Sequence, residues 1–415
     1  MPVTCDILND LCEPARRPVN LRVTPAAQRA IRRGHPWVFD QAIVRRNCEG
    51  RCGDFAVIYD DKNRFLAVGL YDPDSPIRVR ILHQGRPTAI DQGWFGARLA
   101  DAVGQRAPLA TACTTGYRLV HGENDKLPGL VVDRYDQTVV IKLDTAAWIA
   151  HLRSVLAALA SVMPAQRIVL RLSRAVLAKS EHLHGLGDGS VLSGPPLEGP
   201  VPFLDNGLKF EADPILGQKT GFFLDQRDNR ARFEKLTAGA VVLNVFAYTG
   251  GFSIYAARGG ARDVVSLDIS RPALAAAARH FELNRDDQSV AAAHHELLVA
   301  DAFEALGELA NGRRRFDVIM IDPPSFTRKQ DQVEKALAAY ERLARLGLRV
   351  LRNGGIIALA SCSSRVSADS FFTTVHQAAR RAGRPLSEIE RTGHPLDHPI
   401  GFEEGAYLKC LFARA

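Results

Sequence analysis

Short apolar runs alternate with helix-forming segments throughout residues 241–360, and this alternation constrains the fold more than any other feature of the sequence. Apolar strands of this kind suit a parallel sheet whose two faces are both covered by helices. The region therefore predicts a doubly wound, mostly parallel α/β fold. We expect strands at 242–246, 264–267, 296–300, 316–321 and 356–360, with helices near 271–281 and 333–346.

A glycine turn follows the first of these strands. The strand breaks at Gly250 and Gly251, and the chain resumes as the helix-forming run 253–257. Glycine lets a ligand approach the backbone closely, and the amides that open a helix favour an anionic group such as a carboxylate. The turn lacks the Gly-Lys-Ser/Thr of a phosphate loop and the complete dinucleotide fingerprint. A cofactor without phosphates is therefore the better match.

Acidic residues stand at the ends of three successive strands. Asp268 lies eighteen positions after Gly250, where a carboxylate can bind the two hydroxyls of a ribose. Asp301 ends the next strand, in a place to accept a hydrogen bond from an adenine amino group, and Asp322 ends the strand after that. The alternative is that each aspartate only caps the following helix. Three such residues together favour a site for an adenosine cofactor.

Two motifs at strand ends indicate the chemistry. Asp322-Pro323-Pro324-Ser325-Phe326 follows the strand 316–321, and consecutive prolines fix the backbone there. Ser361-Cys362-Ser363 follows the strand 356–360, so we expect its thiol and the Asp322 carboxylate to face one cleft, where open α/β sheets bind ligands. Taken singly, the first motif is an ordinary turn and Cys362 a small buried hydrophobe. Together they indicate an S-adenosylmethionine site beside a cysteine nucleophile.

A longer distinctive stretch supports this interpretation. It reads Lys219-Thr220-Gly221-Phe222-Phe223-Leu224-Asp225-Gln226-Arg227-Asp228-Asn229-Arg230 and continues at Asn244-Val245-Phe246-Ala247-Tyr248-Thr249-Gly250. With the two strand-end motifs, it resembles the class I methyltransferases that make 5-methylcytosine in large-subunit ribosomal RNA, in the branch with an N-terminal PUA domain. The resemblance runs from Gly34-His35-Pro36-Trp37-Val38-Phe39 to Tyr407-Leu408-Lys409. It departs before residue 18, in what looks like an added tail, and at Asp205, where glutamate is expected.

The resemblance also implies the order of domains. After a tail (1–17) come a small PUA-like RNA-binding β-barrel (18–90), an α+β linking domain with a β-hairpin (91–200), and a Rossmann-like class I methyltransferase domain (201–415). In that last domain the sheet is mostly parallel and seven-stranded, and the run 407–412 closes it as an antiparallel strand. The short strand-like runs between residues 21 and 82 are compatible with the barrel.

The resemblance further implies a covalent mechanism. Cys362 adds to carbon 6 of cytosine and thereby activates carbon 5, while Asp322 hydrogen-bonds the ring edge and stabilises charge as the adduct forms. The target base has to be single-stranded or flipped out of its stack. The base that removes the carbon 5 proton has no candidate in the sequence.

Site residues are assigned in two groups. Gln226 and Arg227 are expected at the methionine end of S-adenosyl-L-methionine, since arginine suits a carboxylate, although a structural role for Arg227 is the alternative. Lys219 either binds RNA phosphate or caps its loop. The cofactor group is Gln226, Arg227, Asn244, Phe246, Tyr248, Thr249, Gly250, Phe252, Asp268, Asp301, Ala302 and Asp322. The RNA group is Arg29, Arg32, Arg33, Arg45, Arg46, Lys219, Pro323, Ser325 and Phe326.

Positive charge is concentrated near the start of the chain. The formal net charge is +7 and the pI is about 9.1. Between residues 14 and 51 there are nine arginines against only Asp40 and Glu49, which accounts for the whole excess. Arginine-rich faces attract phosphate backbones, and guanidinium planes stack on unpaired bases. Beside a methyltransferase core, an RNA-docking surface is a better interpretation than a solvated helix face.

Composition sets the remaining bounds. With 415 residues the chain should hold two or three domains, and 46% apolar with 24% charged residues is ordinary for a globular protein. No apolar run is long enough to span a bilayer and the acidic start is not a signal peptide, so we expect a cytoplasmic protein. Seven dispersed cysteines predict free thiols, with neither a disulfide framework nor a metal site. Homodimerisation is left open.

Three rival functions remain. An enzyme of the same fold that methylates a guanine nitrogen would share the Asp-Pro-Pro turn but needs no cysteine adduct. Many such enzymes place an aromatic residue directly after the prolines, whereas here Ser325 precedes Phe326. A non-catalytic RNA-binding assembly factor that keeps the fold is the second rival, and the three acidic strand ends and Cys362 count against it. A nicotinamide dehydrogenase is a weaker option, because the fingerprint is missing.

Overall fold

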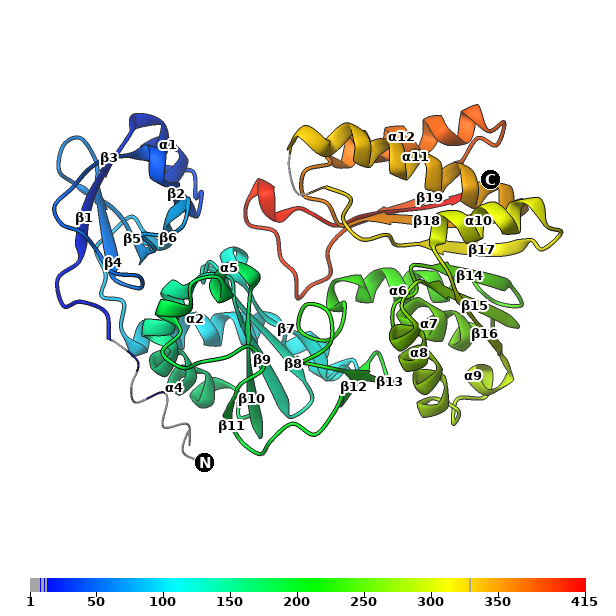
Figure 1. Ribbon diagram of the computed structural model, residues 1–415, viewed down its shortest axis with the longest axis horizontal. Coiled ribbons are helices and arrows are strands. Elements are labelled where there is room, and N and C mark those ends of the chain that lie inside the picture. Colours follow the sequence, from blue (N-terminus) through cyan, green and yellow to red (C-terminus); the bar gives the residue numbers. More distant parts are fainter. Residues whose placement is uncertain (1–7, 9–10, 12, 328–329) are drawn as a thin grey trace. The chain divides into compact units, whose positions relative to one another are not determined.

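The computed structural model describes residues 8, 11, 13–327 and 330–415. The chain forms two compact units (Figure 1). The first unit comprises residues up to Leu204 together with the segments Ala212–Leu224 and Leu396–Phe402. The second comprises Asp205–Glu211, Asp225–Pro395 and Glu403–Ala415. Among the described residues, no helix combines the length and apolar character needed to cross a bilayer.

A six-stranded sheet with one α-helix forms the N-terminal part of the first unit. The strands are β1 (Val19–Val23), β2 (Trp37–Phe39), β3 (Ile43–Arg46), β4 (Phe55–Tyr59), β5 (Phe65–Tyr71) and β6 (Ile77–Gln84), in the order β2-β6-β5-β4-β1-β3. Buried and more exposed residues alternate along β1 and β4, so one face of the sheet builds a core. Helix α1 (Pro25–Arg32) begins where the Thr24 hydroxyl accepts a hydrogen bond from the Ala27 amide.

A second α+β part completes the first unit. Its five-stranded sheet has the order β11-β10-β9-β8-β7, with β7 (Gly116–His121), β8 (Leu130–Tyr135), β9 (Thr138–Leu143), β10 (Arg167–Leu172) and β11 (Val191–Ser193). The expected hairpin is present as the antiparallel pair β7 and β8. The helices are α2 (Gln92–Gln105), α3 (Ala107–Thr111), α4 (Leu152–Val162) and α5 (Arg174–Leu177). The strands β12 (Val201–Asp205) and β13 (Leu208–Ala212) form a separate ribbon, of which Asp205–Glu211 belongs to the second unit.

The second unit is the predicted doubly wound sheet. Its strands are β14 (Val241–Val245), β15 (Asp263–Asp268), β16 (His294–Val299), β17 (Phe316–Ile321), β18 (Leu351–Ser361), β19 (Ser387–Thr392) and β20 (Lys409–Arg414). The order is β16-β15-β14-β17-β18-β20-β19, and the first five strands run parallel to one another. The fold class expected from the sequence is confirmed.

Helices cover both faces of this sheet (Figure 1). Helices α10 (Ala302–Asn311), α11 (Val333–Val350) and α12 (Ala368–Arg381) bury apolar residues together with the strands in one continuous core. Helices α6 (Arg227–Glu234), α7 (Gly251–Arg258), α8 (Arg271–Leu283) and α9 (Gln288–Ala292) accompany the first three strands, and α7 and α8 contact them directly. The strands buried on both faces are the ones with almost wholly apolar sequences.

The C-terminal edge of the sheet differs from the expectation. Strand β20 is antiparallel as predicted, but it pairs with β18 on one side and with β19 on the other. The terminal strand is therefore internal, and β19 forms the edge. Strand β19 reads Ser-Glu-Ile-Glu-Arg-Thr and is exposed along nearly its whole length. A polar edge strand gives no apolar signal, and charged side chains protect such an edge from pairing with other chains.

Candidate active site

The loop after β14 is held in an uncommon backbone conformation. Phe246 and Tyr248 have φ angles of 61° and 47°, and Gly250 has 77°. Left-handed backbone at two non-glycine residues is unfavourable and occurs where the surroundings fix it, often at functional sites. The Ala247 amide donates to the Leu267 carbonyl at 2.9 Å, and this bond ties the loop to the neighbouring strand.

Gly250 is required by packing as well as by its φ angle. A Cβ atom built on it would lie 2.7 Å from the Cβ of Ala277 in α8. The absence of a side chain thus lets the loop lie against α8, in addition to the close ligand approach that the sequence suggested. Nearby, the ring of His280 is hydrogen-bonded through Nδ1 to the Thr249 carbonyl at 2.8 Å. Burial lowers the pKa of His280 to about 4, so the ring is neutral at physiological pH.

Two of the acidic strand ends brace backbone amides. Asp268 accepts hydrogen bonds from the Tyr248 amide through Oδ2 and from the Ser270 amide through Oδ1, both at 2.8 Å. Asp301 caps α10, because its Oδ1 accepts from the amides of Phe303 at 2.9 Å and Glu304 at 3.2 Å. Oδ1 of Asp301 thus caps the following helix, which was the alternative to binding a cofactor. Its Oδ2 accepts no hydrogen bond from the described residues, and the side chain is half-exposed.

Several residues assigned to the cofactor are buried and engaged with the protein. Asn244 donates through Nδ2 to the Ser253 hydroxyl at 2.9 Å, and Gln226 accepts from Asn229 at 2.6 Å. Arg227 is 1% exposed and donates through Nε to Asp205 at 2.8 Å. This geometry favours the structural alternative for Arg227. Phe252, Ala302 and Thr249 are also buried, and Phe246 and Tyr248 are half-buried.

The thiol of Cys362 lies beside the Asp-Pro-Pro turn. Its Sγ is 3.9 Å from the Pro323 carbonyl oxygen, and both Cys362 and Asp322 are half-exposed. Tyr340 of α11 lies close by, with its hydroxyl 2.8 Å from that of Ser361. Burial raises the pKa of Tyr340, and the negative charges of Cys362 and Asp322 raise it further. The two motifs that are 40 positions apart in the sequence are therefore neighbours at the carboxyl ends of β17 and β18.

The rest of the turn is fixed by local contacts. The Ser325 hydroxyl donates to the Thr327 carbonyl at 2.9 Å. The ring of Phe326 packs edge-on against Tyr340, with centroids 5.1 Å apart. Pro323 is buried, whereas Ser325 is exposed and Phe326 is half-buried against the core. Of the three residues assigned to RNA here, Ser325 is thus the one most open to solvent.

Lys409 was not anticipated from the sequence. It is 4% exposed, and its Nζ donates to the carbonyls of Val366 at 2.6 Å and Tyr407 at 3.2 Å, and also to that of Ser363. Burial lowers the pKa of Lys409 to about 8, while the negative charge of Cys362 acts in the opposite direction. The available signal was a single cation in the otherwise apolar run Leu408–Phe412, a position that should be occupied by an apolar residue.

Comparison with known proteins identifies the family. The sequence model of the S-adenosylmethionine-dependent methyltransferases matches residues 142–414. The chain belongs to this family. A PUA-like domain model matches residues 21–84, where the structure has the six-stranded sheet. The cofactor of the methyltransferase is S-adenosylmethionine, as the strand-end residues predicted.

Relatives of the methyltransferase cover nearly the whole of this chain. It is 47% identical to a protein of Deinococcus radiodurans named "Ribosomal RNA large subunit methyltransferase", over 95% of this chain and 97% of the relative. It is 36% identical to the "Ribosomal RNA large subunit methyltransferase I" of Alteromonas mediterranea, over 93% and 96% respectively. The crystal structure of SMU.776, described as a methyltransferase complexed with SAH, has the same fold, with a TM-score of 0.82 at 24% identity over 95% of this chain and all of that one.

Arginines are exposed on the PUA-like part of the methyltransferase. Within the described residues, Arg29, Arg33 and Arg45 form no ion pair, whereas Arg46 pairs with Glu49. Arg45 lies directly opposite Arg22 across the antiparallel strands β3 and β1. Like charges in such a pair repel each other, so a polyanion bound there would be stabilising.

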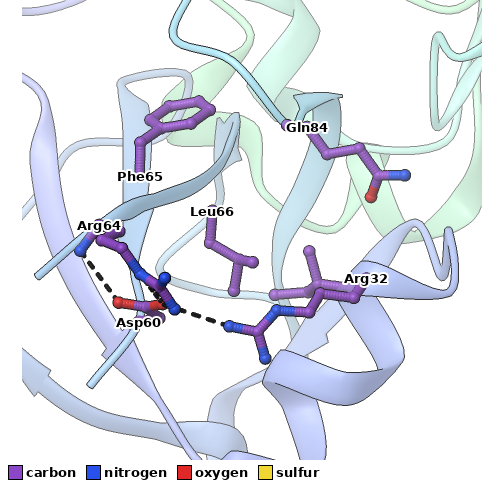
Figure 2. A pocket seen from close by; sticks show the side chains of 8 residues that line it. Arg32, Asp60, Arg64, Phe65, Leu66 and Gln84 are labelled. Carbon is purple, nitrogen blue, oxygen red and sulfur yellow. Dashed lines mark hydrogen bonds and ion pairs between the residues drawn. The ribbon is translucent and has the colours of Figure 1, made fainter. Parts of the chain in front are cut away.

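A pocket of about 450 Å³ lies between α1 and the strands β5 and β6. Figure 2 shows Arg32 and Arg64 both directed toward Asp60, which lines the pocket; the nitrogen–oxygen distances are 3.3 Å and 2.8 Å. The hydrogen bond from Arg64 lowers the pKa of Asp60 to about 2. Arg32 thus already has an anionic partner and is a weaker candidate for RNA than Arg29 or Arg33. Lys219 is exposed, and its Nζ lies 4.6 Å from the centre of the Phe223 ring.

Proposed function

We propose that this methyltransferase modifies carbon 5 of a cytosine in large-subunit ribosomal RNA through a cysteine adduct at carbon 6. The observation that carries the proposal is the half-exposed thiol of Cys362 beside the Asp322 turn. The names of the two relatives support the RNA substrate. A ribosomal RNA substrate in turn supports a cytoplasmic location. Methylation of a guanine nitrogen would not require this thiol.

The reaction divides between the cofactor and the protein. S-adenosylmethionine supplies an electrophilic methyl group. The thiolate of Cys362 forms a bond to carbon 6 of cytosine, and the displaced electron pair makes carbon 5 nucleophilic. After methylation, loss of the carbon 5 proton to a base allows the sulfur–carbon bond to break, which restores the thiolate and the aromatic ring. Asp322 hydrogen-bonds the edge of the cytosine and orients the ring for attack at carbon 6.

The residues around the β14 loop fit the cofactor. Asp301 has a carboxylate oxygen still available for an adenine amino group, and Asp268 lies half-exposed at the end of its strand. Phe246, Tyr248 and Gly250 form a fixed loop beside them. We assign binding of the ribose to Asp268 and binding of the adenine to Asp301. Arg227, Gln226 and Asn244 are assigned a supporting role, in which they hold the loops around the cofactor in place.

Tritium release tests the position of methylation. RNA transcribed in vitro with tritium at carbon 5 of cytosine is expected to lose one tritium to water for each methyl group transferred, because that carbon exchanges its hydrogen for the methyl. Naked transcript and reconstituted particles are assayed separately, and the product nucleosides are identified. Methyl transfer without tritium release, or a methylated guanine among the products, would refute the proposal.

Charge reversal tests the RNA-docking surface. The double variant Arg33→Glu and Arg45→Glu is expected to weaken RNA binding about equally for different sequences and to reduce the slope of log affinity against log salt by about 2. A matched variant, Arg313→Glu with Arg380→Glu, makes the same change in net charge on exposed residues of the second unit. Equal losses in both variants would mean that net charge, and not this surface, attracts RNA.

A further inference from the structure

Lys409 is a buried cation held against the loop that carries the proposed nucleophile. In the antiparallel pairing of β18 with β20, Lys409 lies opposite Ser361, the residue before Cys362. Its side chain then reaches the loop that follows Cys362, where it meets the carbonyls of Ser363 and Val366. Strand β20 thus places one ammonium group in contact with the loop that follows Cys362.

Its three hydrogen bonds keep the ammonium charged and fixed. An ammonium has three N–H donors, and three carbonyl oxygens accept them, from Ser363, Val366 and Tyr407. Such compensation is needed because an unpaired buried charge is strongly unfavourable. With a pKa of about 8, most Lys409 side chains are protonated at neutral pH. All the donors are engaged, so Lys409 is unsuited to transferring a proton to substrate.

Some groups near Cys362 oppose a thiolate. Asp322 contributes a negative charge from the end of β17, and Tyr340 of α11 and Cys410 of β20 both have raised pKa values, to which the charge of Asp322 contributes. Arg365, on the same loop, is exposed, so solvent screens its charge. Lys409 is therefore a buried cation that can balance a negative sulfur. The attraction is mutual, since the Cys362 charge stabilises protonated Lys409.

We propose that Lys409 is a positioning residue that fixes the Cys362 loop and stabilises the Cys362 thiolate by its charge. This inference rests on the proposed cysteine chemistry and adds the group that makes the cysteine reactive. Its consequence is a higher fraction of thiolate at neutral pH than Asp322 and burial alone would allow.

Alkylation of the full-length enzyme tests this role without RNA. The rate of iodoacetamide modification of Cys362 is followed by peptide mass spectrometry across a series of pH values. In Lys409→Met the midpoint of the profile is expected to move up by about one pH unit, with the rate at neutral pH falling about tenfold. In Lys409→Arg, which keeps the charge, much of the shift should be absent. Arg365→Gln is the matched control, with a profile close to that of the wild type.

Binding of S-adenosylmethionine, measured by calorimetry, reports whether each variant is folded. If Lys409→Met does not bind the cofactor, Lys409→Gln replaces it, because Gln keeps two N–H donors for the carbonyls without the charge. A variant that is folded but has an unchanged alkylation midpoint would overturn the proposal and leave Lys409 as a structural support of the loop. Tritium release is a separate measurement. Its failure would remove the cytosine chemistry but not a dependence of Cys362 reactivity on Lys409.

Discussion

Replacing Cys362 with alanine is expected to abolish 5-methylcytosine formation, with a loss of at least about a thousandfold in rate, since the variant lacks the thiol proposed to form the covalent bond. Cofactor binding should persist, because Cys362 lies at the end of β18, whereas the residues assigned to the adenosine follow β14, β15 and β16. Methyl transfer is measured with radiolabelled S-adenosylmethionine, and binding by calorimetry on the same preparation.

Cys410→Ala is the matched control for this loss. Cys410 is also near Asp322 but is 0% exposed, and burial keeps the pKa of its thiol well above the usual range, so it cannot serve as the nucleophile. The Cys410 variant should retain methylation. If Cys362→Ala still produced 5-methylcytosine, the assignment of Cys362 as the covalent nucleophile would be wrong. Loss of methylation in Cys410→Ala instead would point to Cys410.

The sequence predicted the interior of the catalytic sheet well because its strands are buried on both faces. The run Phe316–Ile321 was expected from its apolar residues alone, and β17 has these same bounds. The polar edge strand β19 escaped detection because neither of its faces carries an apolar pattern. Hydrophobic periodicity in a sequence indicates which residues are buried. The exposed strand β19 is specified instead by its backbone pairing with β20.

The residues of the candidate site that lie at strand ends could be predicted from the sequence. The residues whose partners are distant in the sequence could not. Strand order brought Cys362 next to the Asp322 turn, as expected from two neighbouring parallel strands. The partner of Arg227 depends on the hairpin containing Asp205, and the role of Lys409 depends on the antiparallel register of β20. Such contacts follow from three-dimensional packing, and local sequence gives no sign of them.

Neutralising Asp205 is expected to destabilise the second unit strongly. Asp205 is 0% exposed, and its two oxygens accept from Arg227 at 2.8 Å and Arg230 at 2.6 Å. Both arginines are themselves buried, so Asp205→Asn removes a negative charge that two buried cations share. Breaking a buried ion pair in this way costs about 3–5 kcal/mol of unfolding free energy. Amide hydrogen exchange in α6 and α7 measures the loss where it occurs.

The same variant decides what Arg227 does. If Arg227 is structural, Asp205→Asn and Arg227→Gln should lose similar protection from exchange, and each should weaken cofactor binding only through that loss. If Arg227 instead binds the methionine carboxylate, Arg227→Gln should reduce cofactor affinity far more than Asp205→Asn does.

Glu282→Gln provides the control, because its pair with Arg285 is exposed and such pairs contribute less than about 1 kcal/mol. Protection that stays unchanged in Asp205→Asn would show that the buried pair does not stabilise this unit, and the structural role of Arg227 would then lose its basis.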